Sequence, residues 1–249
     1  MGIQSIPEHE LARLREKAKE ITGSQFDYQS SYTELLSRRL NGEPLQYIEE
    51  YVPFYSIQIN VDQRCLIPRP ETEYMIEIIK NNIDTPKKIL DVGTGTGCIA
   101  LMMKKLFPES EVHAVDISDD ALSLAKENAE INNLEVNFYQ SDLLSNVETL
   151  DFDLIVANLP YIPTSTLSTL AKEVIEHEPL IALDGGEDGR LYIDKLLNDL
   201  KNIDSKELVL VLEVDTSHAE SLLSSFTDWE DVKLEKDLVE RDRYIVARK

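Results

Sequence analysis

The chain has 249 residues, 42% of them hydrophobic and 29% charged, which is enough to bury the core of one large domain with a small appendage. Its 25 Lys and Arg residues face 47 Asp and Glu residues, and the resulting net charge of −22 disfavours direct nucleic-acid binding. No apolar run approaches the roughly 20 residues of a membrane helix, so we expect a cytoplasmic protein with no membrane partner.

The cysteines and histidines give no sign of a metal site. Cys65 and Cys98 are the only cysteines, and they lie far apart in the chain. The four histidines show no pairing at the spacing of metal ligands. We therefore expect no structural metal, and we expect both cysteines to fill buried positions.

The first 50 residues have a helical pattern. Apolar side chains recur at intervals of three and four from Pro7 to Gly23, where the glycine ends the helix, and again from Tyr32 to Leu40. Two short helices cannot form a large core, so we expect residues 1–50 to dock on a main domain as a short helical region. Residues 42–48 are expected to be a connector.

Residues 51–71 are predicted to form a β-hairpin linker. Phe54 to Val61 alternates between apolar and polar side chains, as a half-buried strand does, and Asp62-Gln63 is the expected turn. The linker ends in Pro68-Arg69-Pro70, a stiff loop from which Glu71 or Thr72 begins a helix through Ile79. Arg69 and Glu73 are candidates for shaping a substrate entrance, and the alternative is a purely structural ion pair.

Strand and helix patterns alternate through residues 72–249, which predicts an α/β fold with a doubly wound, mostly parallel, seven-stranded sheet and an antiparallel edge hairpin. The predicted strands are 88–92, 111–116, 135–140, 154–158, 208–213, 231–236 and 243–247. The predicted helices are 97–107, 118–132, 166–174, 189–202 and 216–226.

A glycine-rich loop joins the first of these strands to a helix in the stretch from Asp91 to Gly97. Gly93, Gly95 and Gly97 permit positive φ and let a ligand lie against the backbone. The spacing is not that of a dinucleotide loop, which would require glycine at Cys98. An acidic residue before the loop suits an ammonium group better than a pyrophosphate. We therefore expect S-adenosylmethionine, with Asp91, Thr94 and Thr96 in the site beside the glycines.

The ends of the next two strands also carry acidic residues. Asp116 is placed to accept hydrogen bonds from both ribose hydroxyls of such a cofactor. Asp142 is a candidate acceptor for the adenine amine, and Leu143 is expected to pack on the adenine ring. The alternative for Asp116 is an ordinary cap at the end of a strand.

Asn158-Leu159-Pro160-Tyr161 follows the apolar strand 154–156. The Asn158 side-chain oxygen and the Leu159 carbonyl can each accept one hydrogen of a planar NH2 group, and the Tyr161 ring can cover its face. Pro160 favours extended geometry at residue 159. This stretch therefore fits a clamp for methylation of an amide or amino nitrogen, and the alternative is a simple strand-ending turn.

These residues together resemble the class I S-adenosylmethionine-dependent methyltransferases, and more narrowly the protein-(glutamine-N5) methyltransferases that modify peptide-chain release factors. The matching stretches are residues 42–45, 66–73, 91–97 and 178–189, together with Asp237-Leu238 and Arg241–Arg243. The resemblance implies a Rossmann-like fold, S-adenosylmethionine as cofactor, a release factor as protein substrate, and Asn158, Leu159, Pro160 and Tyr161 as the catalytic stretch. It also adds Asn158 to the cofactor-contacting residues and implies that the helical region of residues 1–50 serves partner recognition.

Two features depart from this family. Its usual motif has proline at position 159, and its N-terminal helical domain is larger. The form Asn-Leu-Pro-Tyr also occurs in small-subunit rRNA adenine dimethylases, so rRNA adenine N6-methylation is one alternative, although a charge of −22 is unfavourable for it. The other alternative is a non-catalytic module that binds S-adenosylmethionine.

Overall fold

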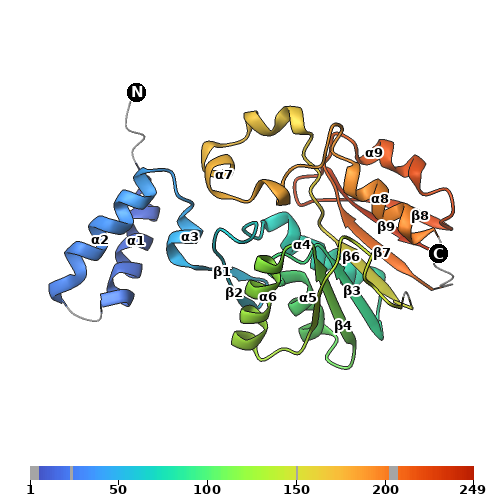
Figure 1. Ribbon diagram of the computed structural model, residues 1–249, viewed down its shortest axis with the longest axis horizontal. Coiled ribbons are helices and arrows are strands. Elements are labelled where there is room, and N and C mark those ends of the chain that lie inside the picture. The colour runs from blue at the N-terminus through green and yellow to red at the C-terminus, as the bar shows by residue number, and fades with distance from the viewer. Residues whose placement is uncertain (1–5, 23–24, 150, 202–206) are drawn as a thin grey trace.

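The computed structural model describes residues 6–22, 25–149, 151–201 and 207–249. Its first two helices, α1 (Glu8–Thr22) and α2 (Gln25–Leu40), confirm the helical pattern of the N-terminal region, although α2 begins earlier than the predicted Tyr32. The predicted end of the first helix at Gly23 lies outside the described residues. The two helices pack side by side at one end of the molecule (Figure 1).

The expected connector contains a short helix, α3 (Leu45–Glu49), which the sequence pattern did not predict. Pro44 precedes it, and Leu45, Tyr47 and Ile48 are buried. Leu45 and Ile48 pack with Leu14 and Leu35 of the first two helices, so α3 completes a small separate core.

The hairpin exists, but its predicted turn is wrong. Strands β1 (Tyr51–Phe54) and β2 (Ile57–Asn60) pair antiparallel, so the turn lies at Tyr55-Ser56 and not at Asp62-Gln63. Tyr55 adopts φ +53° without being a glycine. The apolar alternation continues through this turn and no glycine or asparagine marks it, which is why the pattern looked like one strand.

The main domain contains a seven-stranded sheet of order β5-β4-β3-β6-β7-β9-β8. The first five strands in this order are parallel, and β9 runs antiparallel to both β7 and β8, which confirms the predicted architecture. The strands are β3 (Lys88–Val92), β4 (Glu111–Asp116), β5 (Asn137–Gln140), β6 (Leu154–Ala157), β7 (Val209–Glu213), β8 (Asp231–Lys236) and β9 (Asp242–Arg248).

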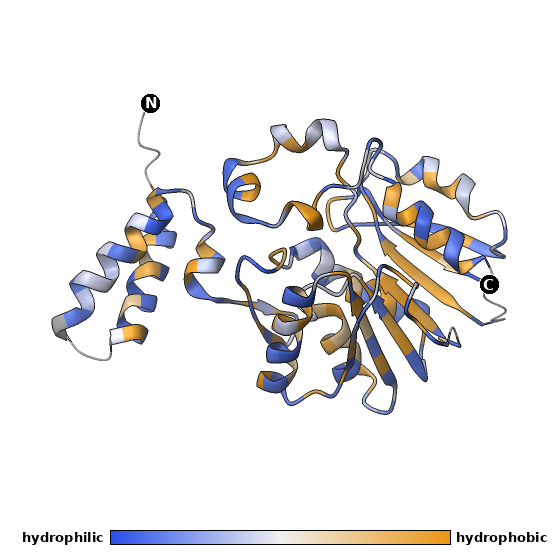
Figure 2. Ribbon diagram, viewed as in Figure 1, coloured by the Kyte–Doolittle hydropathy of each residue, from blue (hydrophilic) through white to orange (hydrophobic). Residues whose placement is uncertain are grey.

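Helices cover both faces of this sheet because its buried strands present apolar side chains on both sides. Ile89 packs with α4 and α5, whereas the next residue, Leu90, packs with α8 and α9. Figure 2 shows the apolar strands enclosed by helices whose outer faces are polar. The helices are α4 (Pro70–Asn82), α5 (Cys98–Leu106), α6 (Asp119–Asn132), α7 (Lys172–His177), α8 (Leu191–Leu200) and α9 (Ala219–Leu222).

Two of the predicted helices are wrong in detail. Instead of one helix over 166–174, a 3-10 helix at Thr164–Thr169 precedes α7. The predicted helix over 216–226 contains α9 followed by a 3-10 turn at Leu223–Ser225. The last residue of the predicted helix 189–202 lies outside the described residues, and no helix within them is long and apolar enough to cross a membrane.

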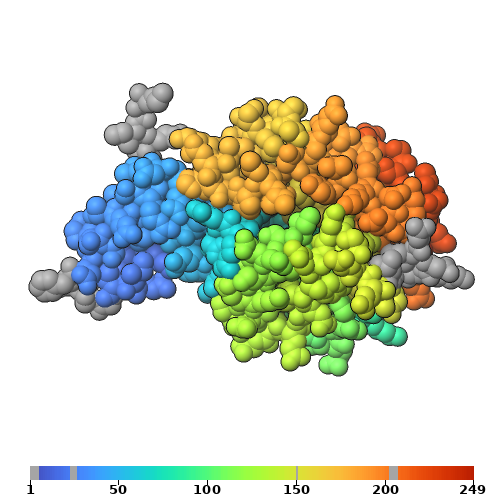
Figure 3. All heavy atoms as spheres, in the orientation of Figure 1, coloured from blue at the N-terminus to red at the C-terminus, as the bar shows by residue number. Residues whose placement is uncertain are grey.

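The N-terminal helices contact the segment that contains α7 (Figure 3). Arg39 donates to Glu10 at 2.6 Å and to Glu173 of α7 at 2.9 Å, so one guanidinium joins the helical appendage to the main domain. A second joint lies at the hairpin, where the fully buried Asn128 of α6 accepts from the Asn60 N–H at 2.7 Å and donates to the carbonyls of Asn60 and Thr96.

We expect Asn128→Ala to lower the free energy of unfolding by about 2–4 kcal/mol, because it leaves buried backbone groups of Asn60 and Thr96 unpaired. Urea denaturation measures the change. Glu130→Ala, on the exposed side of the same helix, is the control and should change stability by less than about 0.5 kcal/mol. Equal stabilities of the two variants would contradict this role.

Candidate active site

A cavity opens at the carboxyl ends of strands β3, β4, β5 and β6, where ligands bind in open α/β sheets. Ten of the predicted site residues line it: Gly93, Thr94, Gly95, Thr96, Asp116, Asp142, Leu143, Asn158, Leu159 and Pro160. Asp91, Gly97, Tyr161, Arg69 and Glu73 are not among the lining residues. The structure thus gathers the two predicted groups, the glycine loop and the Asn158 stretch, around one space.

The glycine loop requires glycine for conformational reasons. Gly95 adopts φ +54°, yet a Cβ on it would meet no atom within 4 Å, so its backbone conformation and not crowding excludes other residues. Gly93 adopts φ +72°, and a Cβ there would lie 2.9 Å from Leu159 Cδ2. The loop therefore offers an open backbone surface on one side and packs against Leu159 on the other.

Asp91 lies fully buried beneath this loop. Its Oδ2 accepts from Thr94 Oγ1 at 2.7 Å and from the Ala100 N–H at 3.1 Å. Its Oδ1 has no hydrogen-bond partner among the described residues. Burial, together with the nearby Asp116 carboxylate, raises the pKa of Asp91 to about 7. An unpaired buried carboxylate oxygen of this kind fits a cationic ligand.

Asp116 ends β4 with its carboxylate held by backbone donors. The Gly95 N–H donates to Oδ2 at 2.9 Å and the Ser118 N–H donates to Oδ1 at 3.0 Å. Burial raises the pKa of Asp116 above its ordinary value. Each oxygen keeps a second lone pair, so the carboxylate can still accept from hydroxyl groups in the cavity.

The third strand contributes Asp142 and Leu143. Asp142 forms an ion pair with Lys195 of α8 at 2.5 Å, a partner that the sequence did not indicate. Leu143 adopts φ +50°, which is uncommon for a side chain of its size and turns the buried leucine toward the cavity that it lines. This edge of the cavity therefore combines an apolar surface with one acidic group that has its own counter-charge.

Asn158 has a defined orientation. Its Nδ2 donates to Thr72 Oγ1 at 2.9 Å and to Glu213 Oε2 at 3.0 Å. No donor among the described residues binds its Oδ1 or the Leu159 carbonyl oxygen. Both oxygens are thus available as acceptors beside the cavity, as the Asn-Leu-Pro-Tyr pattern predicts.

Glu213 is the functional residue that sequence reasoning missed. It ends β7 with 1% of its surface exposed and also accepts from Tyr161 Oη at 3.3 Å. Burial raises the pKa of Glu213 to about 7. The signal available in the sequence was its position, since an acidic residue ends the apolar strand Val209–Leu212 at the same sheet edge.

The stretch after Asn158 is braced by residues 183–189. The Ile162 N–H donates to the Leu183 carbonyl, and the Gly185 N–H donates to the Ile162 carbonyl at 2.8 Å. A Cβ on Gly189 would lie 2.3 Å from the Tyr161 carbonyl oxygen, so only glycine fits there. This close backbone contact fixes the path of the turn that carries Asn158.

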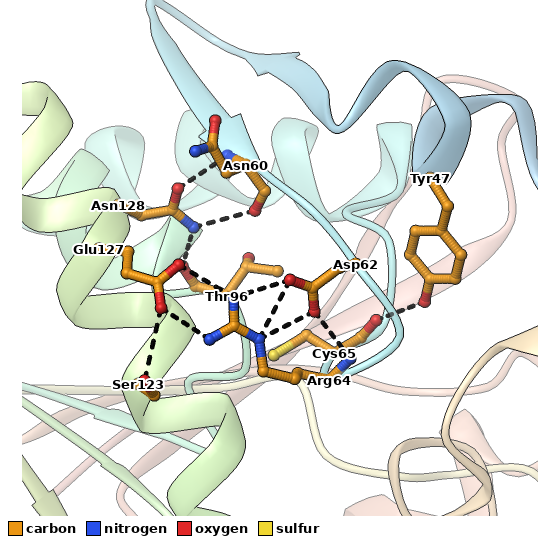
Figure 4. Close-up of polar contacts among 9 residues, drawn as sticks. All are labelled: Tyr47, Asn60, Asp62, Arg64, Cys65, Thr96, Ser123, Glu127 and Asn128. Atoms are coloured by element: carbon orange, nitrogen blue, oxygen red, sulfur yellow. Dashed lines mark hydrogen bonds and ion pairs between the residues drawn. The ribbon is translucent and has the colours of Figure 1, made fainter.

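The linker also lines the cavity, through residues 64–66 and 68. Figure 4 shows the polar contacts that Arg64 and Cys65 make. Arg64 binds Asp62 and Glu127, each at 2.7 Å, and Tyr47 Oη donates to the Cys65 carbonyl at 2.7 Å. Cys65 and Cys98 are both buried, as predicted. The Glu127 contact joins residue 64 to α6, and the Tyr47 contact joins residue 65 to α3.

Arg69 and Glu73 bind other parts of the chain and are not among the cavity-lining residues. Arg69 pairs with the buried Glu178 at 2.5 Å, and Glu178 also accepts from the Ile67 N–H at 3.1 Å. Glu73 accepts from the Tyr55 N–H at 2.5 Å. Arg69 therefore forms an ion pair, which was the structural alternative to a role at the substrate entrance. This ion pair joins the Pro-Arg-Pro loop to the chain segment that leads to residues 183–189.

The seven-stranded sheet, with a glycine loop after β3 and an acidic residue at the end of β4, has a Rossmann-like fold of the kind that class I methyltransferases share. Residues 70–193 match the family model described as the methyltransferase small domain. A methyltransferase from Pyrococcus furiosus has the same fold, with a TM-score of 0.59, 21% identity, and coverage of 87% of this chain and 98% of that one.

The similarity to curated proteins is more specific. The release factor glutamine methyltransferase of Koribacter versatilis is 38% identical over 226 residues, which are 90% of this chain and 81% of the relative. That of Bacillus cereus is 34% identical over 247 residues, 95% of this chain and 85% of the relative. The chain belongs to the release factor glutamine methyltransferase family and is a methyltransferase.

We expect the free energy of unfolding to fall as pH rises toward 7 without ligand. The buried Asp91 and Glu213 carboxyls have ordinary pKa values of 3.8 and 4.5 and folded values of about 7, so the folded state holds more protons in this window. Each contributes a slope of at most about −1.4 kcal/mol per pH unit, which levels off above about 7.

Urea denaturation at pH 5, 6, 7 and 8 measures this slope. The double variant Asp91→Asn with Glu213→Gln lacks both carboxyl groups and should show a flatter profile between pH 5 and 7. An unchanged slope in that variant would mean that other groups cause the pH dependence.

Proposed function

We propose that this chain binds S-adenosylmethionine in the cavity and transfers its methyl group to the side-chain amide N5 of a glutamine in a peptide-chain release factor. The observation that carries the proposal is the orientation of Asn158, whose nitrogen is bound to Thr72 and Glu213 and whose oxygen remains an unpaired acceptor. Family membership supports both the reaction and the class of substrate.

The residues present fit the cofactor. The unpaired Asp91 Oδ1 suits its ammonium group, and the Asp116 carboxylate suits its ribose hydroxyls. Asp142 and Leu143 would contact the adenine, and the backbone of residues 93–97 would lie along the ligand. When bound, the cofactor would supply a methyl group carried on a positively charged sulfur, and loss of the methyl group would leave that sulfur as a neutral thioether.

The protein's part in this reaction is to present the amide nitrogen. An amide nitrogen is a weak nucleophile because its lone pair is delocalised into the carbonyl group. Asn158 Oδ1 and the Leu159 carbonyl would accept its two hydrogens and hold the nitrogen toward the methyl group. The Tyr161 ring would pack on the amide plane, and its hydroxyl already donates to Glu213.

We assign recognition of the protein substrate to the helical region of residues 1–50, with residues 51–71 as the linker and 72–249 as the catalytic domain. Arg69 and Glu73 would act at the entrance through the loop that they hold. The charge of −22 favours a protein partner over RNA, because a phosphate backbone would be repelled.

We expect Asn158→Ala to bind S-adenosylmethionine normally and to lower kcat by about 100-fold or more, because it removes one of two acceptors that position the amide. The assay follows labelled methyl groups on a release factor, on the factor with its acceptor glutamine replaced, and on rRNA. Label on rRNA, or near-normal turnover by the variant, would overturn the proposal.

We expect Leu159→Ala to distinguish the role of the backbone carbonyl at this position from the role of the leucine side chain. The leucine is buried against Gly93, so its truncation should lower the free energy of unfolding by about 2–5 kcal/mol. Because the acceptor is a backbone oxygen, kcat at a temperature where the variant is folded should change by less than about 5-fold. A loss as large as that of Asn158→Ala would contradict this assignment.

A further inference from the structure

Glu213 is a buried carboxylate that has no cationic partner within ion-pair distance among the described residues. It accepts from three side chains, at 2.9 Å from Thr72, 3.0 Å from Asn158 and 3.3 Å from Tyr161. Burying a carboxylate is costly unless its hydrogen bonds and charge are well compensated. Stability of the fold alone therefore does not explain why a carboxylate is buried at this position.

The three donors come from two parts of the fold. Thr72 lies in the first turn of α4, and Asn158 and Tyr161 lie on the turn after β6. Arg243 of β9 lies near them, with its guanidinium 6.0 Å from the centre of the Tyr161 ring. Glu213 is not among the residues that line the cavity, whereas Thr72 and Asn158, which donate to it, both line it.

Hydrogen-bond polarity fixes which end of the Asn158 amide faces Glu213. An ionised carboxylate only accepts, so both Thr72 and Asn158 must donate to it. The single hydroxyl proton of Thr72 points to Glu213, which leaves Thr72 Oγ1 as an acceptor toward Asn158. Both contacts therefore require Nδ2 on this side, and the ionised Glu213 determines the polarity of each.

We infer that Glu213 and Thr72 are positioning residues that hold Asn158 with its oxygen, and not its nitrogen, toward the substrate amide. This rests on the proposed function. A flipped Asn158 would present N–H groups to a substrate NH2 group, donor against donor, and would leave the substrate without its first acceptor. The choice of one amide orientation is thus a condition for catalysis.

The negative charge of Glu213 also strengthens Asn158 Oδ1 as a hydrogen-bond acceptor. When the nitrogen forms its bond to the methyl carbon, the carbon–sulfur electron pair stays on sulfur and the nitrogen becomes positively charged until one amide proton passes to water. A carboxylate behind Asn158 polarises that amide, so Oδ1 is a stronger acceptor for the nitrogen as its charge grows.

The proposal predicts a pH profile as well. The ionisable groups around Glu213 are Arg243 and Tyr244 of β9, Glu71 of α4, Tyr161, and Cys98 of α5. Burial raises the pKa of Glu213 to about 7. Because the ionised form enforces the orientation, kcat at saturating substrates should rise with pH through this region and then level off.

The test combines Glu213→Gln with Asn158→Ala. Glu213→Gln is nearly isosteric and can donate to Asn158 Oδ1, so kcat should fall about 100-fold, with the KM for S-adenosylmethionine within about 2-fold and the rise of kcat near pH 7 lost. In the Asn158→Ala background the same change should cost less than about 3-fold, because Glu213 acts through Asn158. Independent, additive losses would overturn the inference.

Thr72 provides a second pair of variants if Glu213→Gln does not fold. Thr72→Ser keeps the hydroxyl and should retain kcat within about 3-fold, whereas Thr72→Val removes it and should lose about 10-fold or more. Equal activities of the Ser and Val variants would argue against positioning through Asn158.

One readout does not depend on methylation. In the wild-type protein the Asn158 side-chain NH2 protons should exchange slowly with solvent, and in Glu213→Gln they should exchange at least 10-fold faster, as measured by NMR. No change would overturn the inference even if the enzyme is active. A wild-type protein that methylates no release factor, with the exchange difference present, would instead refute the proposed function alone.

Discussion

Five parallel strands end at the same edge of the sheet, and this alignment brings together residues that lie far apart in the sequence. Asp91 is the penultimate residue of β3 and Gly93 follows that strand, Asp116 ends β4, Asn158 follows β6, and Glu213 ends β7. The parallel register determines these positions, because Val92 pairs with both Val115 and Ala157. Each chemical group in the site is therefore in the last two residues of a strand or directly after it, and the packing of that strand holds it in place.

The cavity walls depend on long-range contacts of a different kind. Glu178 accepts from the Ile67 N–H and binds Arg69, so the loop before α4 and the segment after α7 are fixed to each other across 109 residues or more of sequence. The same segment continues to Gly185 and Gly189, which pack on the backbone of Tyr161. The loop before α4 is thus linked to the Asn158 turn through the Glu178 side chain and then through the backbone of residues 178–189.

The sequence predicted the sheet well because its central strands are short runs of apolar residues bounded by clear turns. Strands 88–92, 111–116 and 231–236 were predicted with the bounds that the structure has. The hairpin turn was missed because Tyr55-Ser56 contains no turn-forming residue, and α3 was missed because its five residues are too few for a helical period. The glycine loop and Asn158 are local motifs, whereas the interaction of Glu213 with Thr72 joins residues 141 apart, which no single-sequence pattern reports.

The buried carboxyls at this edge favour binding of the positively charged methyl donor over binding of the neutral product. Asp91, Asp116 and Glu213 each have a raised pKa because burial disfavours their charged forms, so they cost stability when the site is empty of cations. S-adenosylmethionine carries a positive sulfur, and the thioether product does not. A negative sheet edge therefore stabilises the methyl donor more than the product that remains after transfer. A cationic ligand offsets the destabilising effect that these carboxyls have in the unliganded protein, and a neutral ligand does not. The site therefore prefers S-adenosylmethionine over the thioether product.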